Sequence, residues 1–133
     1  MEKVNGSCLC GAVAFETTAE PIAQILCHCS HCQVVSGAQA YAAYIVPLDS
    51  VTLLKGEVDG YPVKAESGNT NIRKFCTQCG SRMWAELPEL AFASVNGMAL
   101  PKGHFQPQGL HRKHNAPDWC LLDERIPDFP PDA

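Results

Sequence analysis

The sequence has no long uninterrupted apolar run, and this absence excludes several classes of protein. Nowhere do about 18 consecutive apolar residues occur, the length that a membrane-spanning helix needs. Residues 1–10 also lack an apolar stretch of signal-peptide length. We therefore expect a cytoplasmic protein that is not inserted in a membrane.

Positive charge is also scarce. The 133 residues carry a formal net charge of -4, with 10 lysines and arginines against 14 acidic residues. Without a basic surface the chain has little that binds phosphate backbones, so nucleic acid is not an expected partner. Apolar residues at 46% and charged residues at 18% are nevertheless ordinary for a folded protein. The length fits a single domain over residues 1–133, with 119–133 as an extended C-terminal tail.

Helical patterning is missing as well, since no internal repeat, heptad or helical stripe longer than two turns occurs. The pattern predicts short strands instead, within residues 6–17, 22–27, 41–46, 51–54, 72–75, 83–87 and 90–95. Residues 34–37 allow one helical turn at most, and 60–71 indicate a loop or a poorly paired hairpin. After Gly97 no regular element is expected, with Trp119 as the only bulky anchor. This arrangement predicts a mainly β domain.

Cysteine, by contrast, is abundant, and its spacing is informative. Seven of the eight cysteines fall into three close groups, Cys8/Cys10, Cys27/Cys29/Cys32 and Cys76/Cys79. Disulfide frameworks usually spread their cysteines along the chain, whereas close groups suit metal chelation. Since a secretory signal is also missing, we favour metal binding over disulfides or redox-active thiols.

The group of three has too few ligands to close a metal site. Cys27 and Cys29 would share one face of a strand, and a turn through Ser30 and His31 would bring Cys32 to the same ion. Three thiolates leave one position of a tetrahedral zinc open, as in catalytic sites. The competing interpretation is a structural zinc with a fourth protein ligand. The candidates for that ligand are His28, His31, His104, His111, His114 and Cys120.

The two remaining pairs together supply four thiolates, enough for a closed structural site. Such a site would join the first strand to a turn far along the chain. Cys8 and Cys10 are expected on one face of that strand, and Gly11 and Gly80 are expected to adopt positive φ, which turns amides toward sulfur. His28 and His31 either assist the group of three, by bonding to sulfur or moving a proton, or lie on the surface as interface residues, and we favour the first role. Cys120 is expected to be inert.

Four stretches carry a family resemblance: residues 6–13 (GSCLCGAV), 27–32 (CHCSHC) with Ser36-Gly37, 75–81 (FCTQCGS), and Pro101 with His104-Phe105 and Trp119. Together they resemble the glutathione-dependent formaldehyde-activating (centromere protein V-like) family. The resemblance implies a β-rich, tent-shaped Mss4-like fold with two zinc ions per chain. It implies a structural zinc on Cys8, Cys10, Cys76 and Cys79, and a catalytic zinc on Cys27, Cys29 and Cys32.

The resemblance also implies a carbon–sulfur lyase reaction of the S-(hydroxymethyl)glutathione synthase type. A small glutathione-like thiol would add to formaldehyde or a related small aldehyde, or be released from the adduct. Zinc suits this chemistry because it holds a thiol as the nucleophilic thiolate, or polarises the aldehyde. The alternative is a non-catalytic two-zinc module that presents a surface to another protein. A protein side chain at the fourth zinc position would favour that module, whereas an open position would favour the enzyme.

Overall fold

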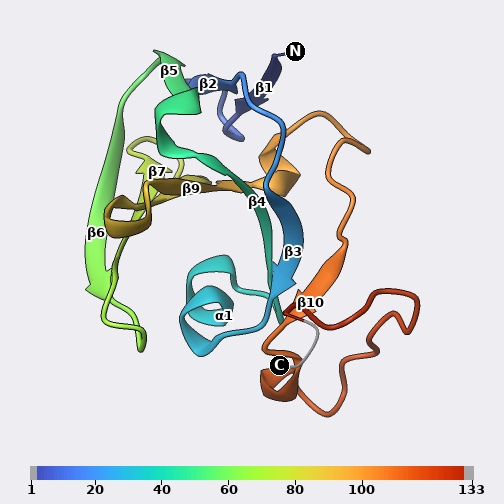
Figure 1. Ribbon diagram of the computed structural model, residues 1–133. Helices are drawn as coiled ribbons and strands as arrows, with labels where there is room; N and C mark the ends of the chain where they lie inside the picture. Colours follow the sequence, from blue (N-terminus) through green and yellow to red (C-terminus); the bar gives the residue numbers. More distant parts are fainter. Residues whose placement is uncertain (1–2, 131–133) are drawn as a thin grey trace.

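The computed structural model describes residues 3–130, which form two sheets with little helix (Figure 1). The strands are β1 (Val4–Ser7), β2 (Ala14–Thr17), β3 (Ala23–Cys27), β4 (Tyr41–Pro47), β5 (Val51–Lys55), β6 (Val58–Lys64), β7 (Thr70–Cys76), β8 (Arg82–Leu87), β9 (Phe92–Asn96) and β10 (Gly109–His111). The helical elements are α1 (Ser30–Ser36) and the short 3-10 helices η1 (Leu48–Ser50), η2 (Pro88–Leu90), η3 (Gly97–Ala99) and η4 (Lys113–Asn115). The predicted mainly β class is confirmed. Within residues 3–130, no helix has the length and apolar composition needed to cross a bilayer.

The two sheets differ in size and position. β1, β2 and β5 form a three-stranded sheet, and the larger sheet has the order β10-β3-β4-β9-β8-β7-β6. Neighbouring strands are antiparallel, except that β10 runs parallel to β3 and places His111 opposite Cys27. Figure 1 shows the small sheet at one end of the molecule and α1 toward the other.

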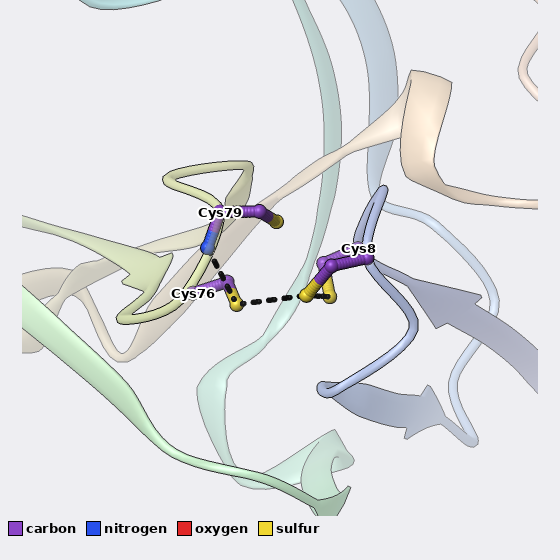
Figure 2. Close-up of side chains that lie close together, drawn as sticks. Cys8, Cys76 and Cys79 are labelled. Carbon is purple, nitrogen blue, oxygen red and sulfur yellow. Dashed lines mark hydrogen bonds between the residues drawn. The ribbon is translucent and has the colours of Figure 1, made fainter.

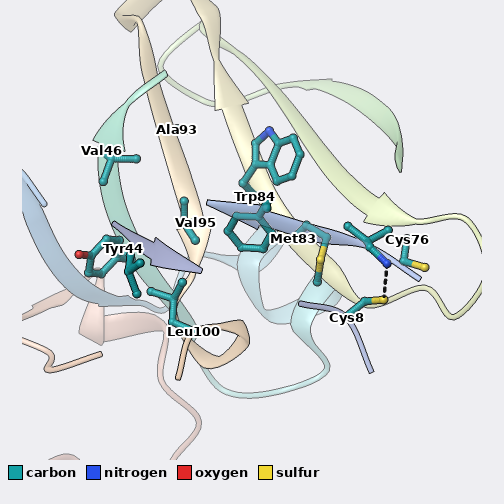
Figure 3. Close-up of a cluster of buried hydrophobic side chains, with 12 residues drawn as sticks. Cys8, Tyr44, Val46, Cys76, Met83, Trp84, Ala93, Val95 and Leu100 are labelled. Carbon is teal, nitrogen blue, oxygen red and sulfur yellow. Dashed lines mark hydrogen bonds between the residues drawn. The ribbon is translucent and has the colours of Figure 1, made fainter. Parts of the chain in front are cut away.

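The main core contains two of the cysteines. Its fully buried side chains include Val13, Phe15, Val46, Met83 and Val95 (Figure 3). Phe15 packs against Trp84 with 5.4 Å between ring centroids. Cys8 and Cys76 belong to the same cluster of buried residues. A change at either cysteine therefore disturbs the main core directly.

A second, smaller cluster surrounds two other cysteines. Cys27 and Cys32 are buried there with residues of β3 and β4, namely Ala23, Ile25, Tyr41 and Ala43. Tyr41 lies opposite Cys27 across these strands, and its hydroxyl donates to the carbonyl of Ser94 at 3.0 Å. This part of the core is thinner and contributes less apolar burial than the main cluster.

The hairpin of β6 and β7 corrects the interpretation of residues 60–71. The two strands pair without interruption from Val58, opposite Cys76, to Lys64, opposite Thr70, so only 65–69 form a turn. Pro62 is tolerated because β6 is the outer strand of its sheet, where one side needs no amide donor. Pairing across the hairpin therefore overrides the weak strand signal of the sequence.

Helix α1 is longer than the single turn predicted at 34–37. It begins directly after Cys29, whose sulfur accepts a hydrogen bond from the amide of Cys32 at 3.3 Å. It ends at Gly37, which has φ 69° and closes the helix in the left-handed conformation. Only Cys32 of this helix is buried, so the sequence carries no apolar stripe that would have revealed it.

The C-terminal part is more ordered than the sequence indicates. The unpredicted strand β10 joins β3, and residues near 129 fold back onto it, with the amide of Phe129 donating to the carbonyl of Leu110 at 2.9 Å. Trp119 is 74% exposed, so its predicted role as an anchor is wrong. Residues 131–133 of the predicted tail lie outside the described residues.

Candidate metal centres

Four of the cysteines gather where two loops meet, and we call them the four-cysteine cluster. Cys8 and Cys10 lie between β1 and β2, while Cys76 ends β7 and Cys79 lies in the turn that follows. Their sulfur atoms all lie within 4.8 Å of one another, with 3.6 Å between Cys8 and Cys10 and 3.8 Å between Cys10 and Cys76. Figure 2 shows Cys8, Cys76 and Cys79 converging from the two loops. The structure thus brings together the two pairs that the sequence analysis combined.

The local geometry of this cluster differs in one respect from the prediction. Cys8 and Cys10 do not share a strand face, because β1 ends at Ser7. A turn brings the sulfurs together instead, closed by the amide of Gly11 donating to the carbonyl of Cys8 at 3.2 Å. Gly11 and Gly80 have φ of 80° and 79°, values that residues with a side chain avoid. The positive φ expected at both glycines is confirmed.

Hydrogen-bond donors point at the sulfurs of the four-cysteine cluster. The amide of Val13 donates to Cys8 Sγ at 3.2 Å, and two amides of the turn after β7 donate to Cys76 Sγ at 3.4 Å. The hydroxyl and amide of Ser81 lower the pKa of Cys79 to about 5. Such bonds favour the thiolate, which is the form that binds a metal.

The spacing of the four sulfurs fits zinc. Around a tetrahedral zinc with bonds near 2.3 Å, the sulfurs would lie roughly 3.8 Å apart. The observed distances of 3.6 and 3.8 Å agree with this value. Four protein ligands would occupy every position of the ion, which is the arrangement of a structural site.

The remaining group, which we call the three-cysteine cluster, consists of Cys27, Cys29 and Cys32. Cys27 ends β3, Cys29 precedes α1, and Cys32 lies in its first turn. The prediction that Cys29 shares a strand with Cys27 is wrong, because β3 ends at Cys27 and Cys29 caps the helix that begins at Ser30, where a turn was expected. The three sulfurs nevertheless converge and lie within 4.8 Å of one another.

The three sulfurs of this cluster differ in charge when no metal is bound. Hydrogen bonds from Cys27 and Cys32, with the nearby charge of Arg73, hold the pKa of Cys29 far below its usual value. Interaction with Cys29 and Cys32, together with burial, raises the pKa of Cys27. Arg73 on β7 was not singled out in the sequence, yet its Nη2 lies 3.6 Å from Cys32 Sγ. Cys29 is therefore already in the thiolate form that binds a metal, and a metal would displace the protons of the other two cysteines.

We expect Cys29 to react first with iodoacetamide when metal is removed from the three-cysteine cluster alone and the four-cysteine cluster keeps its ion. Only the thiolate reacts, and the lowered pKa keeps Cys29 deprotonated as the pH falls. Its rate should stay nearly constant from about pH 8 to pH 6, whereas the rate of an ordinary thiol falls about tenfold per unit. Peptide mapping by mass spectrometry at each pH, with a short cysteine peptide as reference, measures this. The same slope for Cys29 and the peptide would contradict the charge assignment.

None of the six residues proposed as a fourth ligand joins the three-cysteine cluster within residues 3–130. His28 is buried, but its Nδ1 donates to the carbonyl of His111 at 3.1 Å rather than to a sulfur. His104 bonds to the hydroxyl of Tyr44 at 3.1 Å, and His31 is exposed. Three thiolates without a fourth protein ligand are the donor set of a zinc site with an open position.

A cavity of about 250 Å³ adjoins Cys27 and Cys29. Its walls come from three parts of the chain: Cys27 with residues 29–31, the turn 65–67 between β6 and β7, and the end of β10 with the segment that follows it, namely His111, Arg112 and Asn115. Glu66 and Arg112 face each other here as an ion pair of 3.2 Å. The sequence analysis missed this cavity, because its walls are far apart in the chain and meet only through strand pairing.

Comparison with known proteins agrees with this geometry. Residues 3–118 match the family model described as glutathione-dependent formaldehyde-activating enzyme. A crystal structure of a Rhodobacter sphaeroides protein is similar in fold, with a TM-score of 0.56 and 20% sequence identity over 74% of this chain and 88% of that chain. No curated protein matches the chain at a significant level. The family match covers most of the residues and includes all seven clustered cysteines, so the chain belongs to the glutathione-dependent formaldehyde-activating enzyme family.

Proposed function

We propose that the chain is a zinc-dependent enzyme that adds a small glutathione-like thiol to formaldehyde or a related small aldehyde, or catalyses the reverse reaction. One observation carries the proposal: among residues 3–130 the three-cysteine cluster has no fourth protein ligand, and it borders a cavity. The name of the matched family supports the same two substrates. The reaction would be of the carbon–sulfur lyase type, and the cytoplasmic location stays a prediction.

The proposal gives the two clusters different roles. The four-cysteine cluster would hold a structural zinc, and Cys27, Cys29 and Cys32 would hold the catalytic one. A zinc ion bound there supplies a Lewis acid that favours the thiolate form of an incoming thiol. Cys27 and Cys29 line the cavity, so a small molecule in the cavity reaches the cluster directly.

The chemistry requires movement of one proton and no redox partner. The S–H bond and the π bond of the aldehyde break, a C–S bond forms, and the proton ends on the former carbonyl oxygen. His31 lines the cavity, and an imidazole can take up this proton and return it. Arg73 offsets part of the negative charge of the cluster, which reduces the repulsion that another anionic sulfur meets.

We expect the wild-type protein to speed exchange between glutathione, formaldehyde and their adduct, and Cys29→Ser to return the rate to background. The serine oxygen is a weaker zinc ligand than a thiolate, so the open site loses its metal. Exchange spectroscopy by NMR on the equilibrium mixture measures the rate directly. Cys120→Ser is the matched control, because Cys120 lies outside both clusters and should leave exchange unchanged.

Thiol and aldehyde also react without a catalyst, and this background rate sets the smallest rate enhancement that the test can detect. Exchange at the background rate with wild-type protein, for glutathione and for other common thiols, would contradict the enzyme proposal. The non-catalytic two-zinc module would then be the better interpretation.

A further inference from the structure

Two opposite charges meet at the cavity beside the three-cysteine cluster. Arg112 Nη1 lies 3.2 Å from Glu66 Oε2, and the side chains are 38% and 82% exposed. An ion pair this accessible adds little net stability, because water solvates either partner when they separate. The carboxylate of Glu66 is therefore a partner that another carboxylate can replace.

The backbone around Arg112 is fixed to the elements that carry the three-cysteine cluster. The amide of His28, between Cys27 and Cys29, donates to the carbonyl of His111 at 3.0 Å. The side chain of Gln33 on α1 donates to the carbonyl of Asn115 at 3.0 Å, and the amide of Asn115 donates to the carbonyl of Arg112 at 3.0 Å. The backbone of Arg112 therefore has a fixed position relative to the three-cysteine cluster.

Folding alone gives no reason for an arginine at this position. Arg112 has φ 52° and ψ 42°, a left-handed conformation that glycine adopts with less strain. The neighbouring Lys113 does not line this cavity, and its ammonium pairs with Asp128 at 2.7 Å. Of the two adjacent basic residues, only Arg112 faces the cavity.

We infer that Arg112 binds the carboxylate of the thiol substrate in place of Glu66, so that the site selects thiols that carry a carboxylate. The guanidinium can pair both oxygens of a carboxylate, a geometry that no neutral thiol can use. The other titratable groups that line the cavity apart from the cysteines are His31 and His111, and neither offers such a fork. The inference rests on the proposed function, since the substrate thiol must lie at the three-cysteine cluster.

The test compares two small thiols of similar size, 3-mercaptopropionate with a carboxylate and 2-mercaptoethanol without one. Isothermal titration calorimetry on the zinc-loaded protein gives the Kd of each, and the ratio of the two is the readout. Arg112→Gln should reduce the preference for 3-mercaptopropionate about tenfold, as expected for loss of a charged hydrogen bond. Glu66→Gln should increase the preference, because it removes the competing carboxylate.

Controls separate a binding role from a structural one. Lys113→Gln removes the same charge one residue away and should leave the ratio unchanged, and Arg112→Lys should restore part of the preference. Gln and Arg face similar backbone strain at a positive φ, so Arg112→Gln is expected to fold.

The outcomes distinguish this inference from the proposed function. An unchanged ratio in Arg112→Gln, or a reduced preference in Glu66→Gln, would overturn the role of Arg112 while catalysis of thiol exchange by wild type would still support the enzyme. A preference that depends on Arg112 without any catalysis would support the carboxylate site and count against the enzyme.

Discussion

Replacing Cys76 by serine should leave the chain unfolded under conditions in which the wild-type protein is folded. Cys76 is 1% exposed within the main core, and its sulfur lies 3.8 Å from that of Cys10. Serine would remove one of four thiolates and, with it, the zinc that we assign to this cluster. A structural zinc contributes on the order of 10 kcal/mol, as much as the whole net stability of a typical domain.

Circular dichroism and zinc content per chain measure this effect together. Cys8→Ser should behave in the same way, because Cys8 belongs to the same buried cluster. Cys120→Ser is the control, since that cysteine belongs to neither cluster. A Cys76→Ser protein that keeps the wild-type spectrum and unfolding midpoint would show that the four-cysteine cluster is not needed for folding.

The parts of the fold that were predictable have local signals. β4 and β5 were located from β-branched and aromatic runs that end at proline or glycine, and β8 and β9 from a hairpin pattern around Pro88. The four-cysteine cluster followed from two close pairs, each with a glycine directly after it. These features depend on a few neighbouring residues, so a sequence can reveal them.

The remaining features depend on contacts between distant segments. β10 has only three residues and is defined by its pairing with β3, and α1 has a polar exterior with one buried residue. Arg73 reaches Cys32 because its long side chain extends from β7 to the first turn of α1. The pairing of Glu66 with Arg112 needs the β6–β7 turn to reach the segment after β10. No local pattern encodes such placements. The sequence therefore predicted the two cysteine clusters but not the charged residues around them.

The two zinc ions should leave the protein in a fixed order when a chelator is added. Within the part of the chain that the structure describes, the three-cysteine cluster offers three ligands, and it adjoins a cavity through which a chelator can reach it. Cys27 and Cys32 belong to the smaller core cluster, so the main core should survive loss of this ion. The four-cysteine cluster offers one more ligand, and Cys8 and Cys76 are part of the main core. The first release should therefore occur without unfolding, and the second should coincide with it.

Titration with EDTA, followed by a zinc-sensitive dye and circular dichroism on the same samples, resolves the two steps. Cys29→Ser is the matched variant: it should start with one zinc, lack the first step and retain the second at the wild-type chelator concentration. This variant is needed because two steps alone do not reveal which cluster empties first. A single zinc in the wild-type protein, or loss of both ions together with unfolding, would contradict the assignment. If Cys29→Ser lost the second step instead, the three-cysteine cluster would be the one that holds the fold together, and the two roles would have to be exchanged.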